Sequence, residues 1–340
     1  SILGRLFITS GMYLAAVLQV LIFSFGIARK MRLDEIERAQ IQAQIIDQLK
    51  VNEKLKDKVN RELEQKVRER TREISDSIDY AQRIQDAVLP SKEYLDQIMP
   101  EYMVFYKPKD VVSGDFYWIK ELNKALIVVA ADCTGHGVPG AFMSMLGITL
   151  LDELLGKSSL DTPGQILENL RSKVKEMLAQ RGQAEEQKDG MDMAIAIIDN
   201  EKKELQFAGA HNPLYLIRDS KLITESEPGL EASAVSSGFH LFEYKGDRQP
   251  IGVYWDETKF TTHRVKLMDH DTLYLFTDGF VDQFGGEARN KFKKRRFKEL
   301  LLSFQNESMD MQKELLNNAF DSWRGNHEQI DDVCIIGLRV

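Results

Sequence analysis

The stretch from residue 111 to residue 140, VVSGDFYWIKELNKALIVVAADCTGHGVPG, most constrains the fold because it places two acidic residues at predicted strand ends. Asp115 follows a Ser-Gly step and precedes a short aromatic and apolar run. Asp132 ends the apolar run 125–131, and a glycine-rich turn and a helix-like segment follow it. Short runs rich in β-branched residues predict buried strands. We therefore expect two adjacent antiparallel strands that bring both carboxylates to one end of one sheet.

Two further acidic points lie far downstream, again beside apolar runs. Asp278 follows the run LYLFT and precedes a glycine, and Asp331 and Asp332 precede a final run, VCIIGL. Each aspartate alone is explained as a turn former at a strand end. Taken together they indicate a metal site, because hard divalent cations prefer oxygen ligands and relieve the repulsion between crowded carboxylates.

Seven segments follow one another along the chain: SGDFYW, ADCTGHGVPGA, GMDMAI, AGAHNPLYLI, QPIGV, YLFTDGFVDQFGG and QIDDVCIIGLRV. In this order they resemble the metal-dependent serine/threonine phosphatases of the protein phosphatase 2C (PP2C) class, and within it the bacterial SpoIIE-type branch. The resemblance covers residues 76–340. It implies an α+β fold, an α-β-β-α sandwich of two antiparallel sheets flanked by helices, with the metals at one end of the β sandwich.

The resemblance also implies the site residues. Asp132 bridges two metal ions, and the backbone carbonyl of Cys133 is a further ligand. Asp115 holds metal-bound water, while Asp278 and Asp331 bind the second metal. Asp115 and Asp132 are then the catalytic residues, and Mn²⁺ or Mg²⁺, two ions, suits such an all-oxygen site.

Other residues in the motifs have less definite roles. Asp332 stands where many relatives have Asn, so we place it outside the direct ligand set. Eukaryotic relatives have a histidine two positions after the bridging aspartate; here Thr134 occupies that position and His136 lies four positions on. We therefore interpret His136 as a turn-shaping residue rather than a general acid, and His211 as structural.

Many relatives carry a phosphate-binding arginine upstream of the first motif aspartate. Lys107 and Lys109 lie near that position, and neither is a firm match. Asp192 in GMDMAI either faces the site or belongs to a core strand.

The 340 residues, 43% of them hydrophobic, are enough for one large domain with an extension. A net charge of −8 disfavours a nucleic-acid partner. Two cysteines, Cys133 and Cys334, argue against a disulfide framework and fit a reducing compartment.

The N-terminal segment carries a membrane signature. Residues 6–28 are 23 uncharged positions in a row, and three basic residues follow within 29–32. This length spans the hydrocarbon core of a bilayer, and the basic flank places the C-terminal side in the cytoplasm, so the catalytic domain is expected at the inner (cytoplasmic) membrane. LQVLIFSFGIARKMR is similar to the last helix of seven-transmembrane sensors. Because the sequence opens at Ser1 within an apolar stretch, we expect a piece of a longer protein.

A segment without Gly or Pro, residues 31–89, predicts a long helix. Its apolar stripe predicts a parallel homodimer, although the heptad frame breaks between Val59 and Leu63 and places Arg70 and Ser77 in the seam. LEQKVRERTREI looks like a dimerising linker, and DSIDYAQRIQDAVLP resembles the regulatory helix before a SpoIIE-type core. The predicted domains are a transmembrane helix (1–30), a coiled-coil linker (31–75), a switch helix (76–92) and the phosphatase domain (93–340).

Within that domain, apolar periodicity predicts a series of strands and helices. The strands are 102–106, 114–120, 124–131, 190–199, 204–210, 214–218, 260–267, 272–277 and 333–340; the helices are 138–156, 162–181, 292–303 and 309–323. A polar loop is expected at 182–189 and a surface insertion at 224–249.

Three function classes remain open. The first is a membrane-tethered protein phosphatase acting on phosphoserine or phosphothreonine of a partner, for which the resemblance offers a phosphorylated anti-sigma-factor antagonist. The second is a catalytically silent phosphatase-fold scaffold, which has no need to keep four strand-end aspartates. A two-metal nuclease or cyclase is disfavoured by the acidic balance and the motif order.

Overall fold

The computed structural model describes residues 2–156, 161–180, 188–223 and 231–340. The chain divides into two compact units, one up to Ser75 and one from Asp76 to Val340. Helix α1 (Ile2–Val88) crosses this boundary, so its last turns, 76–88, belong to the second unit.

In the first unit α1 is one unbroken helix, as expected from a segment made mostly of strong helix formers. At 1.5 Å per residue it is about 110 Å long. Its apolar stripe is exposed: Leu63, Val67 and Ile74 keep 58%, 54% and 60% of their surface accessible. The N-terminal part is long and apolar enough to cross a membrane. Helix α3 (Gly137–Leu155) of the second unit passes the same test, although half of its apolar window is buried in the core.

Two antiparallel sheets form the centre of the second unit. The first has the order β2 (Phe116–Leu122), β3 (Ala125–Cys133), β4 (Met191–Asp199), β5 (Glu204–Ala210) and β9 (His263–Lys266). The second has the order β1 (Tyr102–Lys107), β13 (Val333–Arg339), β10 (Thr272–Phe276), β6 (Leu214–Asp219), β8 (Phe239–Tyr244) and β7 (Ala234–Ser236). A small ribbon pairs β11 (Phe284–Gly285) with β12 (Asn290–Lys291).

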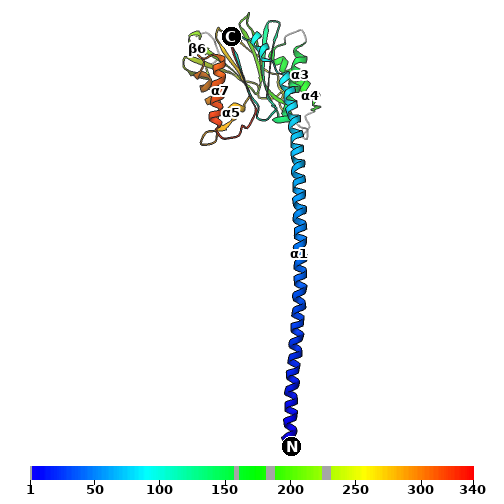
Figure 1. Cartoon of the computed structure of the whole chain (residues 1–340). Coiled ribbons are helices and arrows are strands. Elements are labelled where there is room, and N and C mark those ends of the chain that lie inside the picture. The colour runs from blue at the N-terminus through cyan, green and yellow to red at the C-terminus, as the bar shows by residue number, and fades with distance from the viewer. Residues whose placement is uncertain (1, 157–160, 181–187, 224–230) are drawn as a thin grey trace. The chain divides into compact units, whose positions relative to one another are not determined.

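Helices cover both outer faces (Figure 1). Helices α3 (Gly137–Leu155) and α4 (Pro163–Met177) lie on the five-stranded sheet. The short α5 (Gly279–Asp282), α6 (Lys294–Ser303) and α7 (Met309–Arg324) lie on the six-stranded sheet. The remaining elements are α2 (Lys92–Ile98) and a 3₁₀ turn, η1 (Ser220–Leu222). A separate apolar layer fills the space between the sheets, which confirms the predicted α-β-β-α sandwich.

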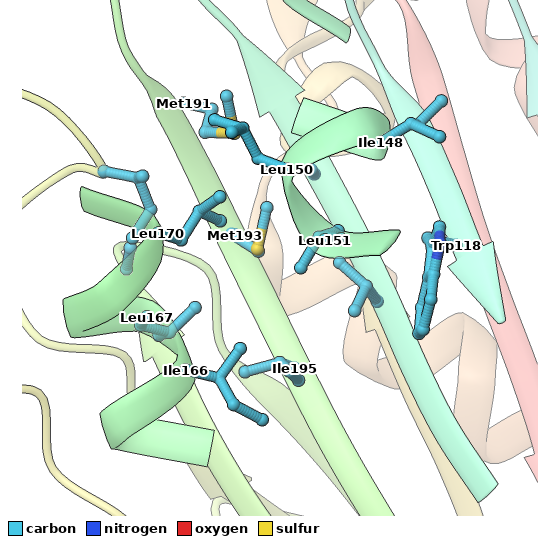
Figure 2. Packing of buried hydrophobic residues seen from close by; sticks show 14 of the residues in the cluster. Trp118, Ile148, Leu150, Leu151, Ile166, Leu167, Leu170, Met191, Met193 and Ile195 are labelled. Atoms are coloured by element: carbon cyan, nitrogen blue, oxygen red, sulfur yellow. The ribbon is translucent and has the colours of Figure 1, made fainter. Parts of the chain in front are cut away.

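The layer under α3 and α4 shows how the helices are held (Figure 2). Leu151 of α3 and Leu167 and Leu170 of α4 are fully buried and face Met193 and Ile195 of β4. Each buried aliphatic side chain stabilises the fold by roughly 1.5–3 kcal/mol relative to exposure. Helix α3 is therefore fixed against the same sheet that carries β3 and β4.

The prediction of a surface insertion at 224–249 is wrong from residue 234 to residue 244. Strands β7 and β8 lie in this part and extend the six-stranded sheet from β6. The prediction failed because β7 has only three residues and β8 carries the polar His240 and Glu243 among its apolar residues. Residues 224–230, most of the predicted loop 182–189 and the predicted helix end at Arg181 lie outside the described residues.

Candidate active site

Strand pairing brings the aspartates of the first sheet together. In the β2–β3 pair Phe116 lies opposite Ala131, so Asp115 and Asp132 stand at the same end, as predicted. In the β3–β4 pair Asp132 lies directly opposite Asp192. Cross-strand partners share a face of the sheet, so Asp192 joins the site rather than the core.

The aspartates of the second sheet lie at the same end. Strand β10 ends at Phe276, directly before Thr277 and Asp278, and β13 begins directly after Asp332. Because β10 and β13 are antiparallel neighbours, these ends lie side by side. A cavity of about 320 Å³ opens here; its lining includes Asp132, Asp192 and Asp331, which come from both sheets.

Glycines allow the loops that carry these residues to pack backbone against backbone. A Cβ on Gly114 would overlap the carbonyl oxygen of Gly135, and a Cβ on Gly279 would overlap the carbonyl oxygen of Asp332. No larger residue fits either place without moving a loop. The glycines of the SGD and TDG motifs therefore set how closely these loops, and the carboxylates on them, approach one another.

Asp332, just before β13, ties its own segment to the connection between β1 and β2. One carboxylate oxygen accepts a hydrogen bond from the backbone N–H of Lys109 and the other from that of Gly114, both at 2.7 Å. The side chain is buried and both of its oxygens are engaged with the backbone. This geometry agrees with a place outside the direct ligand set.

Asp115 is buried and held at both its side chain and its backbone. The Thr277 hydroxyl donates to its carboxylate at 2.6 Å, and the Tyr106 hydroxyl donates to its backbone carbonyl at 3.0 Å. Burial, followed by repulsion from Asp132, raises the pKa of the Asp115 carboxyl well above its ordinary value. A carboxylate held in this environment is stabilised by a nearby cation.

The other aspartates repel one another in the same way. Burial and the charges of Asp278 and Asp331 raise the pKa of Asp132 well above its ordinary value. Although Asp278 remains exposed, partial desolvation followed by Asp282 and Asp331 raises its pKa to about 6. Burial likewise raises the pKa of Asp331. The strand-end aspartates thus form one electrostatically coupled cluster.

This donor set fits divalent cations by its chemistry. Within the described ranges, no three His, Cys, Asp or Glu side chains are already gathered as a closed ligand set. The carboxylates are nevertheless close enough to suppress one another's ionisation, a penalty that a hard cation removes. The Cys133 thiol is fully buried, and burial raises its pKa, so only its carbonyl oxygen suits such a site.

Two histidines at the site are paired with aspartates. His136 Nδ1 lies 2.8 Å from an Asp110 carboxylate oxygen, just before α3, and His136 lines the cavity. His211 Nδ1 lies 2.8 Å from Asp192, and this contact, the largest contribution, raises the pKa of His211. Both rings are fixed by a carboxylate, in keeping with turn-shaping and structural roles.

The two lysines near the position of the family's arginine differ in their contacts. Lys107 binds Asp321 of α7 at 2.7 Å and lies over the Phe320 ring, so its side chain is held against that helix. Lys109 lies near the site: its backbone N–H binds Asp332, and its charge partly offsets the rise in the pKa of Asp331. Lys188, which motif reasoning missed, lines the cavity beside Asp132. Its position next to the GMD motif was the only signal available in the sequence.

Sequence reasoning also missed Gln85, near the end of α1. Its side-chain amide donates to the carbonyl oxygen of Ser113 at 2.7 Å and to the Ser144 hydroxyl at 2.8 Å, and its oxygen accepts from the Ser113 N–H at 3.0 Å. Gln85 is 4% exposed. A glutamine within the apolar stripe formed by Ala81, Ile84 and Val88 was the available signal.

Two stacked antiparallel sheets, covered by helices and carrying a carboxylate cluster at one end, define a PP2C-like phosphatase domain. The SiaA-PP2C domain of Pseudomonas aeruginosa has this fold: its solved structure superposes with a TM-score of 0.67 and 31% identity, over 79% of this chain and 98% of that one. The model of the family described as Stage II sporulation protein E (SpoIIE) matches residues 123–340, and the chain belongs to this family.

Two further relatives agree with this assignment. The phosphoserine phosphatase RsbU of Bacillus subtilis is 24% identical over 271 residues, which are 79% of this chain and 71% of RsbU. The structure of the PP2C phosphatase domain of SpoIIE from Bacillus subtilis, with a fragment of its regulatory domain, has a TM-score of 0.54 at 19% identity, over 70% of this chain and 59% of that one.

Proposed function

We propose that the chain is a membrane-tethered, metal-dependent protein phosphatase that removes phosphate from phosphoserine or phosphothreonine of a signalling partner. The observation that carries the proposal is the convergence of Asp132, Asp278 and Asp331. They come from two different sheets and lie close enough for Asp278 and Asp331 to raise the pKa of Asp132. Membership of a family that includes a phosphoserine phosphatase supports the same reaction class.

In this proposal Asp132, Asp278, Asp331 and the Cys133 carbonyl hold two Mn²⁺ or Mg²⁺ ions. When bound, the ions would supply an activated water and neutralise the phosphoryl oxygens. Asp115, fixed by Thr277 and buried, orients water at the site. Asp332, just before β13, binds the connection between β1 and β2 at both Lys109 and Gly114, and so maintains the place of Asp115.

The proposed substrate is a phosphorylated protein, for which an anti-sigma-factor antagonist is the candidate offered by the sequence resemblance. The cavity supports this substrate class because its volume suits one phosphorylated side chain and Lys188 supplies a positive charge in its lining. Its carboxylates alone would repel a phosphate, so binding in this proposal depends on the cations that they would hold.

We further propose that residues 6–28 span the inner membrane as the last helix of a sensor, that 31–75 form a parallel dimer, and that 76–92 act as a switch. The uncharged run and its basic flank support the first part. The exposed apolar stripe of α1 supports the second, because a surface of this kind is normally buried against a partner. The Gln85–Ser113 contact supports the third, since it links α1 to the loop of Asp115.

A catalytically silent scaffold is the alternative. Hydrolysis of p-nitrophenyl phosphate by the full chain in Mn²⁺ separates the two. The phosphatase proposal expects turnover that Asp132→Asn abolishes and that the same substitution at the exposed Asp256, outside the cluster, leaves in place. Absence of turnover in Mn²⁺ and in Mg²⁺, or turnover that survives Asp132→Asn, would favour the scaffold or a different site.

A further inference from the structure

The segment 249–258 forms a loop that is pinned at its start to the catalytic sheet. The backbone of Ile251 pairs with that of Met191 through two hydrogen bonds, of 2.8 and 3.1 Å. Met191 directly precedes Asp192, the cross-strand partner of Asp132. The first part of the loop is therefore held in a fixed place beside the carboxylate cluster.

The far end of the loop is tied back to its start. The Gln249 side chain accepts from the Thr258 N–H at 2.9 Å and donates to the Thr258 carbonyl at 2.8 Å. Arg171 of α4, itself buried, donates to Gln249 at 2.9 Å and to the Thr258 carbonyl at 3.0 Å. Glu257 also binds Lys175 of α4 at 2.7 Å. These contacts close the loop and fasten it to α4.

At the tip of this fastened loop stands Trp255, 85% exposed. Its ring lies 5.8 Å from that of Tyr254, and just before them Pro250, Gly252 and Val253 line the catalytic cavity. A tryptophan displayed on a rigid loop loses little conformational freedom when it binds a partner, and tryptophan is among the residues that contribute most at protein interfaces. The exposed indole thus follows, by two residues, the Val253 that lines the cavity.

The cavity is too small to contact more of a protein substrate than its phosphorylated residue. Its volume of about 320 Å³ is at the low end for ligand sites, and its lining combines carboxylates and glycines with the apolar Met191, Pro250 and Val253. A space of this size suits one phosphorylated side chain and leaves the neighbouring residues of the substrate outside it. Residues outside the cavity, such as those of the loop 249–258, therefore have to distinguish one protein substrate from another.

We infer that Trp255 is a specificity-determining residue: it packs against an apolar side chain a few residues from the phosphoserine or phosphothreonine of the substrate. The inference rests on the proposed phosphatase function and adds the chemistry of the substrate segment to it. The substrate segment then carries an apolar residue within a few positions of the phosphorylated residue, and is not polar throughout.

The test compares two synthetic phosphoserine peptides, one with leucines at the second to fourth positions on each side and one with serines there. The enzyme is the full chain in detergent with Mn²⁺. The parent should prefer the leucine peptide in kcat/KM, and Trp255→Ala should lower the leucine-to-serine ratio roughly tenfold or more, the scale of an interface hot spot. Trp255→Phe should restore most of the ratio. Val235→Ala, at an exposed apolar residue of β7 in the other sheet, should keep the parental ratio.

The outcomes separate this inference from the function on which it rests. If the parent hydrolyses p-nitrophenyl phosphate but Trp255→Ala keeps the parental peptide ratio, the docking role is wrong and the phosphatase function stands. An equal loss on both peptides and on p-nitrophenyl phosphate also contradicts the docking role, because it shows a general disturbance of the site. If the parent hydrolyses none of the three, the proposed function fails and the inference fails with it.

Discussion

The side chain of Gln85 is hydrogen-bonded to both backbone groups of Ser113, two residues before Asp115. It donates to the carbonyl oxygen at 2.7 Å and accepts from the N–H at 3.0 Å. The end of α1 therefore holds the loop that carries the buried Asp115 carboxylate. A rotation or shift of α1 cannot keep both bonds unless that loop moves with it.

Replacing Gln85 should therefore impair catalysis as well as stability. Gln85→Ala leaves the Ser113 N–H and carbonyl buried without these partners, which costs about 1–3 kcal/mol. We expect turnover of p-nitrophenyl phosphate to fall roughly tenfold, because the loop that carries Asp115 is no longer held; such a fall corresponds to about 1.4 kcal/mol of transition-state stabilisation. Gln65→Ala is the matched control, since Gln65 is an exposed glutamine of the same helix that donates to the exposed Glu69. Parental turnover in Gln85→Ala would show that the contact is dispensable for the site.

The carboxylate cluster predicts an unusual dependence of stability on pH. The pKa of Asp278 rises from 3.8 to about 6 in the folded state. Because the folded state then binds protons more tightly than the unfolded state, this group destabilises the fold as pH rises from about 4 to 6. Divalent cations replace the protons, so Mn²⁺ should raise the melting temperature more at pH 7 than at pH 5.

Thermal melts in EDTA and in Mn²⁺ at both pH values check this, with Asp278→Asn as the comparison. The substitution removes the titrating group, so the Mn²⁺ effect should shrink and the melting temperature in EDTA at pH 7 should rise. An Mn²⁺ shift that is equal at pH 5 and pH 7, and unchanged in Asp278→Asn, would mean that Asp278 does not bind the ion.

The strand-end aspartates could be found in the sequence because their signals are local. An apolar run followed by Asp-Gly marks a strand end and a turn, and antiparallel pairing then places Asp115 near Asp132. The Gln85 contact could not be found in this way, because Ser113 and Ser144 lie 28 and 59 positions away. Strand β7 was missed for another reason: three residues at the edge of a sheet carry too little periodicity to recognise.

The broken heptad frame predicts a dimer that is not maximally stable. Substituting both Arg70 and Ser77 with leucine should tighten the seam and lock one helix register. If 76–92 is a switch, phosphatase activity should then shift away from the parental value. A chain that starts at Glu93 lacks Gln85 and should be less active than the parent. Equal activity in all three proteins would show that the helix is only an anchor.

The membrane proposal is tested by topology. A reporter that is active only in the cytoplasm, fused after Lys50, should be active, because the basic residues at 29–32 retain the C-terminal side there. A reporter that is active only after export should be silent at the same position. The reverse pattern would contradict the orientation, and with it a cytoplasmic catalytic domain.

The central claim is that Asp132, Asp278 and Asp331 together hold two divalent cations that catalysis requires. Calorimetric titration of the metal-free full chain with Mn²⁺ tests it most directly. We predict two ions per chain for the parent and fewer for Asp278→Ala, with turnover lower by on the order of 10³-fold, since a bound metal supplies several kcal/mol of transition-state stabilisation. An Asp278→Ala protein that binds as many Mn²⁺ ions as the parent and turns over substrate as fast would contradict the claim.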